Sequence, residues 1–258
     1  MGRLADRVVL VSGGTQGLGA EISRAAARAG AAVVLSGRRP ESGEKLVAEL
    51  RGQGADAHYV HADVGDVASA QASVAATVER FGRIDSLVSA AGLTSRGTLL
   101  DTSPDLFDAH IAVNLRGPFF LMQAAVADMV RRGAPGTIVN IITMSAHGGQ
   151  PYLAPYVAAK AGLIGLTRNA AHAHRFDRIR INGVNIGWTD TEGEDEVQRR
   201  FHGATDGWRE RAAHELPMGR LGQPDEIAEL VTFLLSDRSG VVTGSVIDWD
   251  QTVPGAHD

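Results

Sequence analysis

The sequence predicts a single α/β domain built on a doubly wound parallel sheet of about seven strands, with helices on both faces. Two observations lead to this fold class. Short apolar runs alternate with helical patterns along the chain, and no proline- or serine-rich linker, charge block or repeat divides its 258 residues. Parallel strands are joined by right-handed crossovers, which place helices on both faces of the sheet. We therefore treat residues 1–258 as one domain.

Seven runs rich in apolar and β-branched residues are expected to form the strands. They lie at residues 7–12, 32–36, 56–61, 84–89, 137–142, 179–185 and 245–248. The clearest helix covers residues 224–235, which place five apolar side chains on one face: Ile227, Leu230, Val231, Leu234 and Leu235. Pro224 suits the first turn of this helix.

The composition argues against several classes of site and partner. The chain contains no cysteine, so neither a disulfide nor a thiolate metal site can form, and we expect no metal. A formal net charge of -5 without a long basic run argues against a nucleic-acid partner. No stretch of about 18 apolar residues occurs, and the N-terminus lacks the apolar core of a signal peptide. We therefore expect a cytoplasmic protein without a membrane span.

The segment 187–218 interrupts the alternation of strands and helices. It is rich in acidic residues between positions 190 and 196 and then carries Phe201 and Trp208. Ligands of open α/β sheets bind beyond the carboxyl ends of the strands, and this segment follows the sixth strand at that edge. We expect it to form a substrate lid; the alternative is a helical excursion on the surface.

A glycine-rich turn follows the first strand and reads Ser12-Gly13-Gly14-Thr15-Gln16-Gly17-Leu18-Gly19. Glycines at these positions let backbone N–H groups approach a pyrophosphate closely, and the N-terminus of the following helix adds partial positive charge. A good helix-forming stretch begins at Ala20. This context favours a dinucleotide site over a plain strand–helix turn.

Tyr156 and Lys160 lie four residues apart, so on a helix their side chains share one face. Pro155 suits an early helical position. A free tyrosine titrates near pH 10, and a neighbouring lysine cation favours the phenolate. We therefore expect Lys160 to lower the pKa of Tyr156. Lysine is otherwise rare in this chain, with Lys45 as its only other occurrence.

The turn spacing Gly-x-x-x-Gly-x-Gly, together with the segment Tyr156-Val157-Ala158-Ala159-Lys160, resembles the short-chain dehydrogenase/reductase family. The resemblance extends through the whole chain. It implies a Rossmann-type fold, a homotetramer built by helix–helix contacts and a nicotinamide cofactor. It also implies an oxidoreductase that interconverts a secondary alcohol with a carbonyl at the ketone or aldehyde level.

The resemblance implies four catalytic residues, namely Asn114, Thr143, Tyr156 and Lys160. Tyr156 would exchange a proton with the substrate, and Thr143, which stands where the family usually has serine, would hold the substrate oxygen. Lys160 would tune Tyr156 together with an oxidised nicotinamide, and Asn114 would anchor a water that links the lysine to solvent. Ser145 is the alternative to Thr143.

The resemblance also implies a set of cofactor-binding residues along the carboxyl ends of the strands. They are Gly13, Thr15, Gln16, Gly17, Leu18, Gly19, Arg38, Asp63, Val64, Ala91, Gly92, Tyr156, Lys160, Gly187 and Thr191. Ser89 and Ala90 replace two asparagines of the family, and we expect Ser89 still to form a local hydrogen bond. Ile186 replaces a family proline and would contact the cofactor through its backbone.

The end of the second strand bears on the choice of cofactor. An acidic residue there would accept hydrogen bonds from the ribose 2′-OH of NAD, whereas an arginine suits the 2′-phosphate of NADP. In this chain Gly37 occupies the acidic position and Arg38 follows, which favours NADP. Many NADP-dependent relatives carry a second basic residue where this chain has Gln16, so NAD is the alternative.

A sugar or polyol is the first expectation for the substrate, because acidic residues of the lid would accept hydrogen bonds from its hydroxyl groups. The runner-up is a hydrophobic ketone or 3-oxoacyl substrate, with Trp188, Phe201 and Trp208 as apolar walls. A non-catalytic protein that senses NAD(P) is disfavoured because the tyrosine and the lysine are both present. Three side chains are candidate substrate contacts: Ser145, His147 and Trp188.

Overall fold

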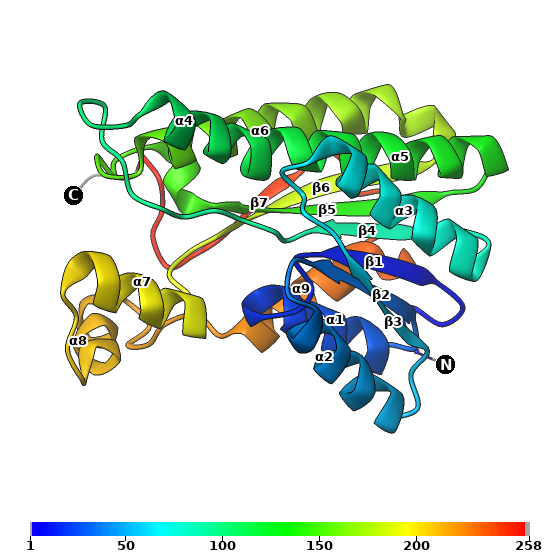
Figure 1. The fold of residues 1–258 in the computed structure, drawn as a ribbon, viewed down its shortest axis with the longest axis horizontal. Coiled ribbons are helices and arrows are strands. Elements are labelled where there is room, and N and C mark those ends of the chain that lie inside the picture. The colour runs from blue at the N-terminus through cyan, green and yellow to red at the C-terminus, as the bar shows by residue number, and fades with distance from the viewer. Residues whose placement is uncertain (1, 256–258) are drawn as a thin grey trace.

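The computed structural model describes residues 2–255 and contains a seven-stranded sheet with the order β3-β2-β1-β4-β5-β6-β7 (Figure 1). All neighbouring strands in it are parallel. The strands are β1 (Val8–Ser12), β2 (Ala32–Gly37), β3 (Ala57–His61), β4 (Ser86–Ser89), β5 (Gly136–Thr143), β6 (Ile179–Ile186) and β7 (Val246–Trp249). The predicted fold class is confirmed, and the predicted strand ends lie within two residues of the observed ones.

Helices cover both faces of the sheet, as Figure 1 shows. One face carries α1 (Gly17–Arg28), α2 (Pro40–Gly52) and α9 (Pro224–Leu235). The other carries α3 (Val67–Phe81), α5 (Gly117–Arg132) and α6 (Ala154–Ala173), with α4 (Pro104–Ile111) beside α6. A π-helical segment, η1 (Ala112–Arg116), joins α4 to α5, and short 3-10 turns lie at η2 (Met144–His147), η3 (Arg175–Asp177) and η4 (Asp237–Ser239). No helix in residues 2–255 is long and apolar enough to cross a membrane.

Alternating side chains of the strands build two separate cores. Val9 and Val11 of β1 are fully buried in the core beneath α1, α2 and α9. Leu10, between them, is fully buried in the core beneath α3 and α5. Because both faces of the sheet are covered, a central strand needs apolar residues at every position. This need explains why the strands read as continuous apolar runs.

The predicted helix at residues 224–235 is confirmed as α9 with the same bounds. Pro224 occupies its first turn, and the Glu226 carboxylate accepts a hydrogen bond of 3.2 Å from the backbone N–H of Gln223. Ile227 and Val231 are fully buried against the sheet. A proline start and an acidic first turn therefore fixed the N-terminal end of this helix.

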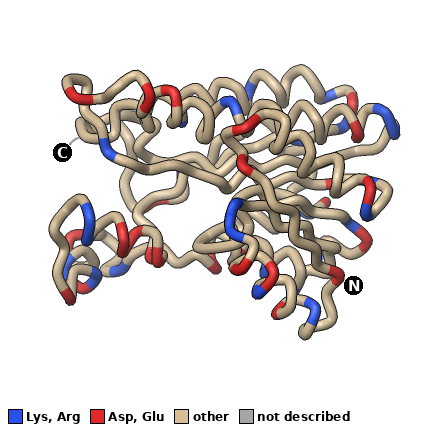
Figure 2. The backbone as a smooth tube through the Cα atoms, in the orientation of Figure 1, with Lys and Arg blue, Asp and Glu red and all other residues tan. Residues whose placement is uncertain are grey.

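The segment 187–218 folds into α7 (Glu192–His202) and α8 (Trp208–Glu215), which project from the sheet (Figure 1). The two helices have a small core of their own around Trp208 and Leu221, with Trp188 packed against it. Two backbone hydrogen bonds of 2.9 Å anchor the segment, from Gly222 to Trp188 and from Asp190 to Gly222. Both helices carry acidic and basic residues (Figure 2): in α7 the acidic residues come first and the arginines last, whereas in α8 the two kinds alternate. Residues 187–218 thus form a compact unit held at its two ends.

Candidate active site

A cleft of about 2030 Å³ opens at the carboxyl ends of the strands. It runs from the turn after β1, past the end of β5 and the start of α6, to helix α7. The catalytic, cofactor and substrate-contact residues expected from the sequence line it, apart from Asn114. Phe201 and Trp208, expected as apolar walls for a hydrophobic ketone, do not line it, because Trp208 is buried in the small core of α7 and α8. Asn114 is fully buried. One cleft therefore gathers residues that are far apart in the sequence.

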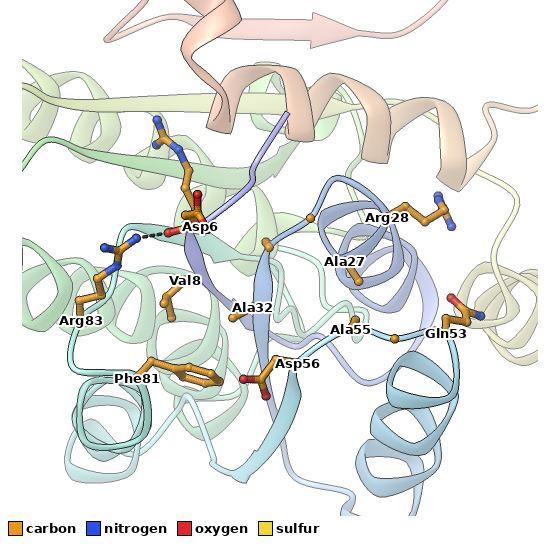
Figure 3. A pocket seen from close by; sticks show the side chains of 14 residues that line it. Asp6, Val8, Ala27, Arg28, Ala32, Gln53, Ala55, Asp56, Phe81 and Arg83 are labelled. Atoms are coloured by element: carbon orange, nitrogen blue, oxygen red, sulfur yellow. Dashed lines mark hydrogen bonds between the residues drawn. The ribbon is translucent and has the colours of Figure 1, made fainter. Parts of the chain in front are cut away.

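A second cavity, of about 620 Å³, lies at the opposite edge of the sheet (Figure 3). Its lining includes Val8 and Ala32, the first residues of β1 and β2. Figure 3 shows Arg83 directed at Asp6, to whose backbone oxygen its guanidinium donates a hydrogen bond. Arg83 also pairs with the Asp85 carboxylate at 2.8 Å. This cavity lies away from the glycine-rich turn, so the larger cleft is the candidate site.

The glycine-rich turn has the shape that a pyrophosphate requires. Gly13 has a φ of 76°, and a Cβ there would lie 2.6 Å from the backbone of Ala91. A Cβ at Gly19 would lie 2.1 Å from the Gly13 carbonyl oxygen, whereas a Cβ at Gly17 would meet nothing within 4 Å. Helix α1 begins at Gly17, and Gln16 gives it no side-chain cap. Uncapped N–H groups beside an open glycine fit an anionic ligand.

The end of β2 is crowded on one side and positively charged on the other. A Cβ at Gly37 would lie 3.0 Å from the Thr15 hydroxyl oxygen. The Tyr59 hydroxyl donates a hydrogen bond of 2.7 Å to the Gly37 carbonyl. Arg38 and Arg39 line the cleft there, and within residues 2–255 neither has a carboxylate inside 4 Å. Both guanidinium groups are therefore free to meet an anion.

Tyr156 and Lys160 share one face of α6, with Pro155 in its first turn. Both are buried, at 9% and 4% exposure. The Lys160 Nζ donates a hydrogen bond of 2.8 Å to the Ile141 carbonyl oxygen of β5, and it lies 5.9 Å from the centroid of the Tyr156 ring. The lysine thus ties the catalytic face of α6 to the neighbouring strand.

Burial governs the titration of this pair. It raises the pKa of Tyr156 to about 12, although a side-chain hydrogen bond with Thr143 acts to lower it. Burial also lowers the pKa of Lys160 to about 8. The lower Tyr156 pKa expected from Lys160 and an oxidised nicotinamide together is thus not a property of the protein alone, in which the loss of solvation outweighs the hydrogen bond and the charges that act on the phenol. At neutral pH Tyr156 carries its proton.

Thr143 is the hydroxyl that meets Tyr156. It is the last residue of β5 and is 8% exposed. Its Oγ1 accepts a hydrogen bond of 3.2 Å from the Ser145 backbone N–H and interacts with the Tyr156 side chain. The Ser145 hydroxyl instead donates to the Gln150 side chain at 2.6 Å. Of the two candidate hydroxyls, Thr143 is therefore the one that interacts with Tyr156, whereas Ser145 is engaged with Gln150.

Asn114 lies in the π-helical segment η1, a feature often found at functional sites. Its side chain accepts a hydrogen bond from the Leu93 backbone N–H and donates one to the Leu93 carbonyl, both of 3.0 Å. It also lies 3.2 Å from His110 Nδ1. The His110 ring meets Tyr156 edge to face, with centroids 6.1 Å apart. These contacts connect Asn114 to Tyr156 through His110, a buried residue that no sequence motif had indicated.

Ser89 ends β4 opposite Ser12 of β1. Its Oγ is buried and has no hydrogen-bond partner among the described residues. The local hydrogen bond expected for Ser89 is therefore absent. Because β4 lies between β1 and β5, the neighbouring backbone groups are engaged in the sheet.

The other two substrate candidates are both held in place by carboxylates. His147 Nε2 lies 3.2 Å from a carboxylate oxygen of Asp248, at the end of β7. Trp188 stacks on Trp208 with centroids 6.1 Å apart, and its Nε1 donates a hydrogen bond of 2.8 Å to Glu194. Both side chains line the cleft on its open side.

Two of the lid carboxylates are engaged within the lid itself. Arg209 donates to Asp190 at 2.7 Å and to Asp195 at 3.0 Å. Asp195 also accepts a hydrogen bond of 2.7 Å from the Trp208 indole, and these donors lower its pKa. Glu192 and Glu196 still line the cleft. The acidic character of the lid therefore serves partly to hold α7 and α8 together.

Arg96 also lines the cleft, in the loop that follows β4. Nothing in the sequence distinguishes it from the other arginines, because it belongs to no motif and no periodic pattern. Its position depends on contacts with residues that are more than fifty positions away. Its positive charge acts to lower the pKa of the Tyr156 phenol, against the larger effect of burial.

Comparison with known proteins identifies the family. The family model described as Enoyl-(Acyl carrier protein) reductase matches residues 13–252. Trans-4-hydroxycyclohexanecarboxylate dehydrogenase of Sinomonas cyclohexanicum is 37% identical over 97% of this chain and 94% of its own length. L-rhamnose 1-dehydrogenase (NAD(P)(+)) of Azotobacter vinelandii is 35% identical over 94% of both chains.

A solved structure agrees with these relatives. A single-residue variant of actinorhodin polyketide ketoreductase, determined with NADPH, superposes with a TM-score of 0.91. It is 31% identical, and the match covers 97% of this chain and 98% of that one. Family model, relatives and structure all support the resemblance drawn from the sequence motifs. The chain therefore belongs to the short-chain dehydrogenase/reductase family and is an NAD(P)-dependent oxidoreductase that acts on CH–OH groups.

Proposed function

We propose that Tyr156 is the proton-transferring residue of this oxidoreductase and that Thr143 holds the reacting oxygen of the substrate. The observation that carries the proposal is the buried Tyr156 phenol, which lines the cleft together with Thr143, the last residue of β5, at the carboxyl edge of the sheet. Buried acids with a matched partner in a cleft are typical of catalytic sites.

A nicotinamide cofactor, when bound, supplies the hydride for reduction or accepts it in oxidation. The turn from Gly13 to Gly19 and the start of α1 would hold its pyrophosphate. In reduction, Tyr156 donates its proton to the carbonyl oxygen as that oxygen gains charge, and the Thr143 hydroxyl stabilises the charge. A pKa of about 12 keeps the proton on Tyr156 until then. In oxidation the same two groups act in reverse.

Asn114 and Lys160 are positioning residues in this proposal. Asn114 fastens the loop after β4 to η1 and supports His110, whose ring packs on Tyr156. Lys160 holds α6 against β5 through its hydrogen bond to Ile141, and its ammonium would hold the ribose hydroxyls of the cofactor. Together they fix the orientation of the phenol in the cleft.

NADP is the cofactor that the end of β2 favours. A carboxylate at Gly37 would crowd Thr15, and Arg38 offers an unpaired guanidinium to a 2′-phosphate. The NADPH in the similar ketoreductase structure supports this choice, whereas the name of the similar rhamnose dehydrogenase allows either cofactor. In Arg38→Ser, kcat/KM for NADPH should fall about tenfold while that for NADH changes little, since a charged hydrogen bond is lost only to NADPH.

Residues 187–218 form the substrate lid in this proposal. They line the cleft from α7, carry a core of their own and are held at two ends. Glu192 and Glu196 favour a ring or chain with several hydroxyl groups, as in the sugar named for one relative. Trp188 on the same wall favours the second candidate, a hydrophobic ketone, as in the polyketide named for the similar structure.

The assembly that we propose is a homotetramer formed through helix–helix contacts. Phe107 of α4 and Phe119 of α5 are 44% and 42% exposed, although both are large and apolar. Exposed aromatic side chains on helices support a subunit contact.

The test of the proposed reaction is a substrate panel with both cofactors. The panel contains ketones and aldehydes of the sugar, cyclic and polyketide classes, and oxidation of NADPH is followed by its absorbance. At least one class should be reduced at ordinary enzyme rates. Absence of turnover for every class with either cofactor would overturn the proposal.

A further inference from the structure

We propose that Arg96 binds a carboxylate of the substrate, so that this enzyme acts on a hydroxy acid or the matching oxo acid. This inference rests on the proposed function and names the substrate class of the same site. It depends on three observations: a main chain fixed beside Tyr156, a guanidinium without an acidic partner, and a place in the wall of the catalytic cleft.

The backbone around Arg96 is fixed on both sides, to the start of α6 after it and to α4 before it. After Arg96, the Gly97 N–H donates to the Tyr152 carbonyl at 2.9 Å, and the Ala154 N–H donates to the Gly97 carbonyl at 3.0 Å. Before it, the Ser95 carbonyl oxygen lies 3.1 Å from His110 Nε2. His110 is the ring that packs on Tyr156. Arg96 is therefore anchored close to the reacting phenol rather than on a free loop.

The guanidinium of Arg96 has no acidic partner. No carboxylate of residues 2–255 lies within 4 Å of it, whereas Arg199 and Arg209 in the lid each pair with two. Its Nη1 donates to the Thr94 carbonyl at 2.6 Å, and its Nη2 lies 3.1 Å from His202 Nε2. Its Nε is buried without a partner among the described residues. An arginine offers five N–H donors; two are engaged here and the Nε–H is buried, so one N–H on each of the two Nη atoms remains available to a ligand.

Aromatic rings hold this cation without neutralising it. The guanidinium carbon lies 5.4 Å from the ring centroids of both Tyr152 and Phe201. Tyr152 belongs to the loop before α6, whereas Phe201 belongs to α7 of the lid. The two rings keep the planar guanidinium in one orientation at the junction of lid and body. A fixed planar fork is the geometry that recognises a carboxylate bidentately.

The charges around Arg96 favour a carboxylate over a phosphate. Glu194 also lines the cleft, and its charge acts on the Tyr156 pKa in the opposite direction to that of Arg96. The other basic residues that line the cleft, apart from the catalytic lysine, lie at the β2 end: Arg24, Arg38, Arg39 and Lys45. One guanidinium, in a part of the cleft that also carries the Glu194 carboxylate, suits a single negative charge better than a dianion.

The test compares paired substrates that differ only in charge. Kinetics with 4-oxopentanoate and its methyl ester, and with 4-oxocyclohexanecarboxylate and its methyl ester, give the ratio of kcat/KM for acid over ester. The wild type should prefer an acid by about tenfold or more, as one hydrogen bond to a charged group allows. Arg96→Gln should lower that ratio to about one, Arg96→Lys should restore it in part, and added salt should reduce it.

Arg200→Gln is the matched control. Arg200 is exposed on α7 and lies over the same Phe201 ring, at 5.1 Å, but it does not line the cleft. This variant should keep the wild-type acid preference. If the esters are turned over as well as the acids, or if Arg96→Gln leaves the ratio unchanged, Arg96 is not a carboxylate site and the proposed reaction still stands. If neither acids nor esters are turned over and no other carbonyl is, the proposed function fails.

A binding measurement keeps the assignment testable without turnover. Cyclohexanecarboxylate has no carbonyl to reduce, and cyclohexanecarboxamide is its uncharged counterpart. Added to the wild-type enzyme with NADPH, the carboxylate should quench the nicotinamide fluorescence at concentrations at least about tenfold lower than the amide. Equal concentrations for the two compounds, or equal quenching in wild type and Arg96→Gln, would refute the assignment.

Discussion

Tyr156 and Lys160 are controlled more by their burial than by each other. The phenol holds its proton strongly, with a pKa of about 12, while the ammonium loses its proton at about pH 8. Both pKa shifts favour the neutral form of the side chain, because a buried site solvates a charge poorly. The protein alone therefore presents a proton donor, and charge in the bound cofactor would be needed to move Tyr156 toward the phenolate.

The buried lysine should make stability depend on pH. The pKa of Lys160 falls from 10.5 to about 8, so between these values the unfolded chain binds more protons than the folded one. Stability therefore rises with pH across this window. Relative to Lys160→Met, the free energy of unfolding of the wild type should increase by about 3 kcal/mol from pH 8 to 10.5, measured by urea denaturation. If the difference in unfolding free energy between wild type and Lys160→Met does not change with pH, folding does not lower the pKa of Lys160.

Sequence motifs identified those site residues that belong to a recognisable local pattern in the chain. Tyr156 and Lys160 have the spacing of one helical face, and Thr143 was indicated by the resemblance to the family. Arg96 and His110 could not be found in this way, since their positions depend on contacts such as those with Phe201 and Asn114. Burial is likewise a property of the whole fold, which is why the raised pKa of Tyr156 in the protein alone could not be read from the motif.

Helices α7 and α8 behave as one element that depends on a few polar contacts. Arg209 joins Asp190 at the start of the segment to Asp195 in α7, and it lies over the Trp208 ring at 4.9 Å. Phe201 and His202 of α7 meet Arg96 of the body. Internal contacts therefore shape the lid, and one aromatic and basic cluster joins it to the catalytic side of the cleft.

Loss of Arg209 should loosen the lid without unfolding the sheet. In Arg209→Ala the two pairs with Asp190 and Asp195 are lost, and together such partly exposed pairs contribute about 1 kcal/mol. KM for the substrate should rise about fivefold, the affinity for NADPH should stay the same, and trypsin should cut residues 187–218 faster. Arg211→Ala, which loses only contacts to residues 205 and 206, should behave as wild type. Equal KM values for the two variants would argue against a lid.

The strands and α9 were predictable because their patterns are local. Residues 224–235 carry their own start signal and a periodic apolar face, and the central strands are apolar throughout. The π-helical segment η1 was not predictable, since Ala112–Arg116 is helical in sequence and its wider turn depends on the contact of Asn114 with Leu93. Residues 187–218 were expected as a substrate lid or a helical excursion, but the bounds of α7 and α8 were not predicted, because their small core includes residues that lie outside the segment, such as Leu221.

In the whole molecule, the hydrophobic cores and the catalytic cleft occupy different parts of one sheet. Two cores fill the space beneath the helices, and the cleft occupies the carboxyl edge alone. The exposed aromatic residues of α4 and α5 lie outside both cores, on the helices that cover one face. This division leaves those helices free to meet other subunits.

The proposed tetramer has a direct measurement. Light scattering after size exclusion should give a mass about four times the 27.1 kDa of one chain. Phe119→Glu should lower that mass, because it places a charge in the proposed helix–helix contact. A wild-type mass of one chain at micromolar concentration would contradict the proposal.

The central claim is that Tyr156 transfers the proton, and Tyr156→Phe tests it most directly. The substitution removes one hydroxyl from a buried ring and leaves its packing against His110 in place. With the best substrate of the panel, kcat should fall by a factor of about 10² to 10⁴, while NADPH affinity and the melting temperature stay close to wild type. A Tyr156→Phe enzyme that is correctly folded and retains near-normal kcat would contradict the account.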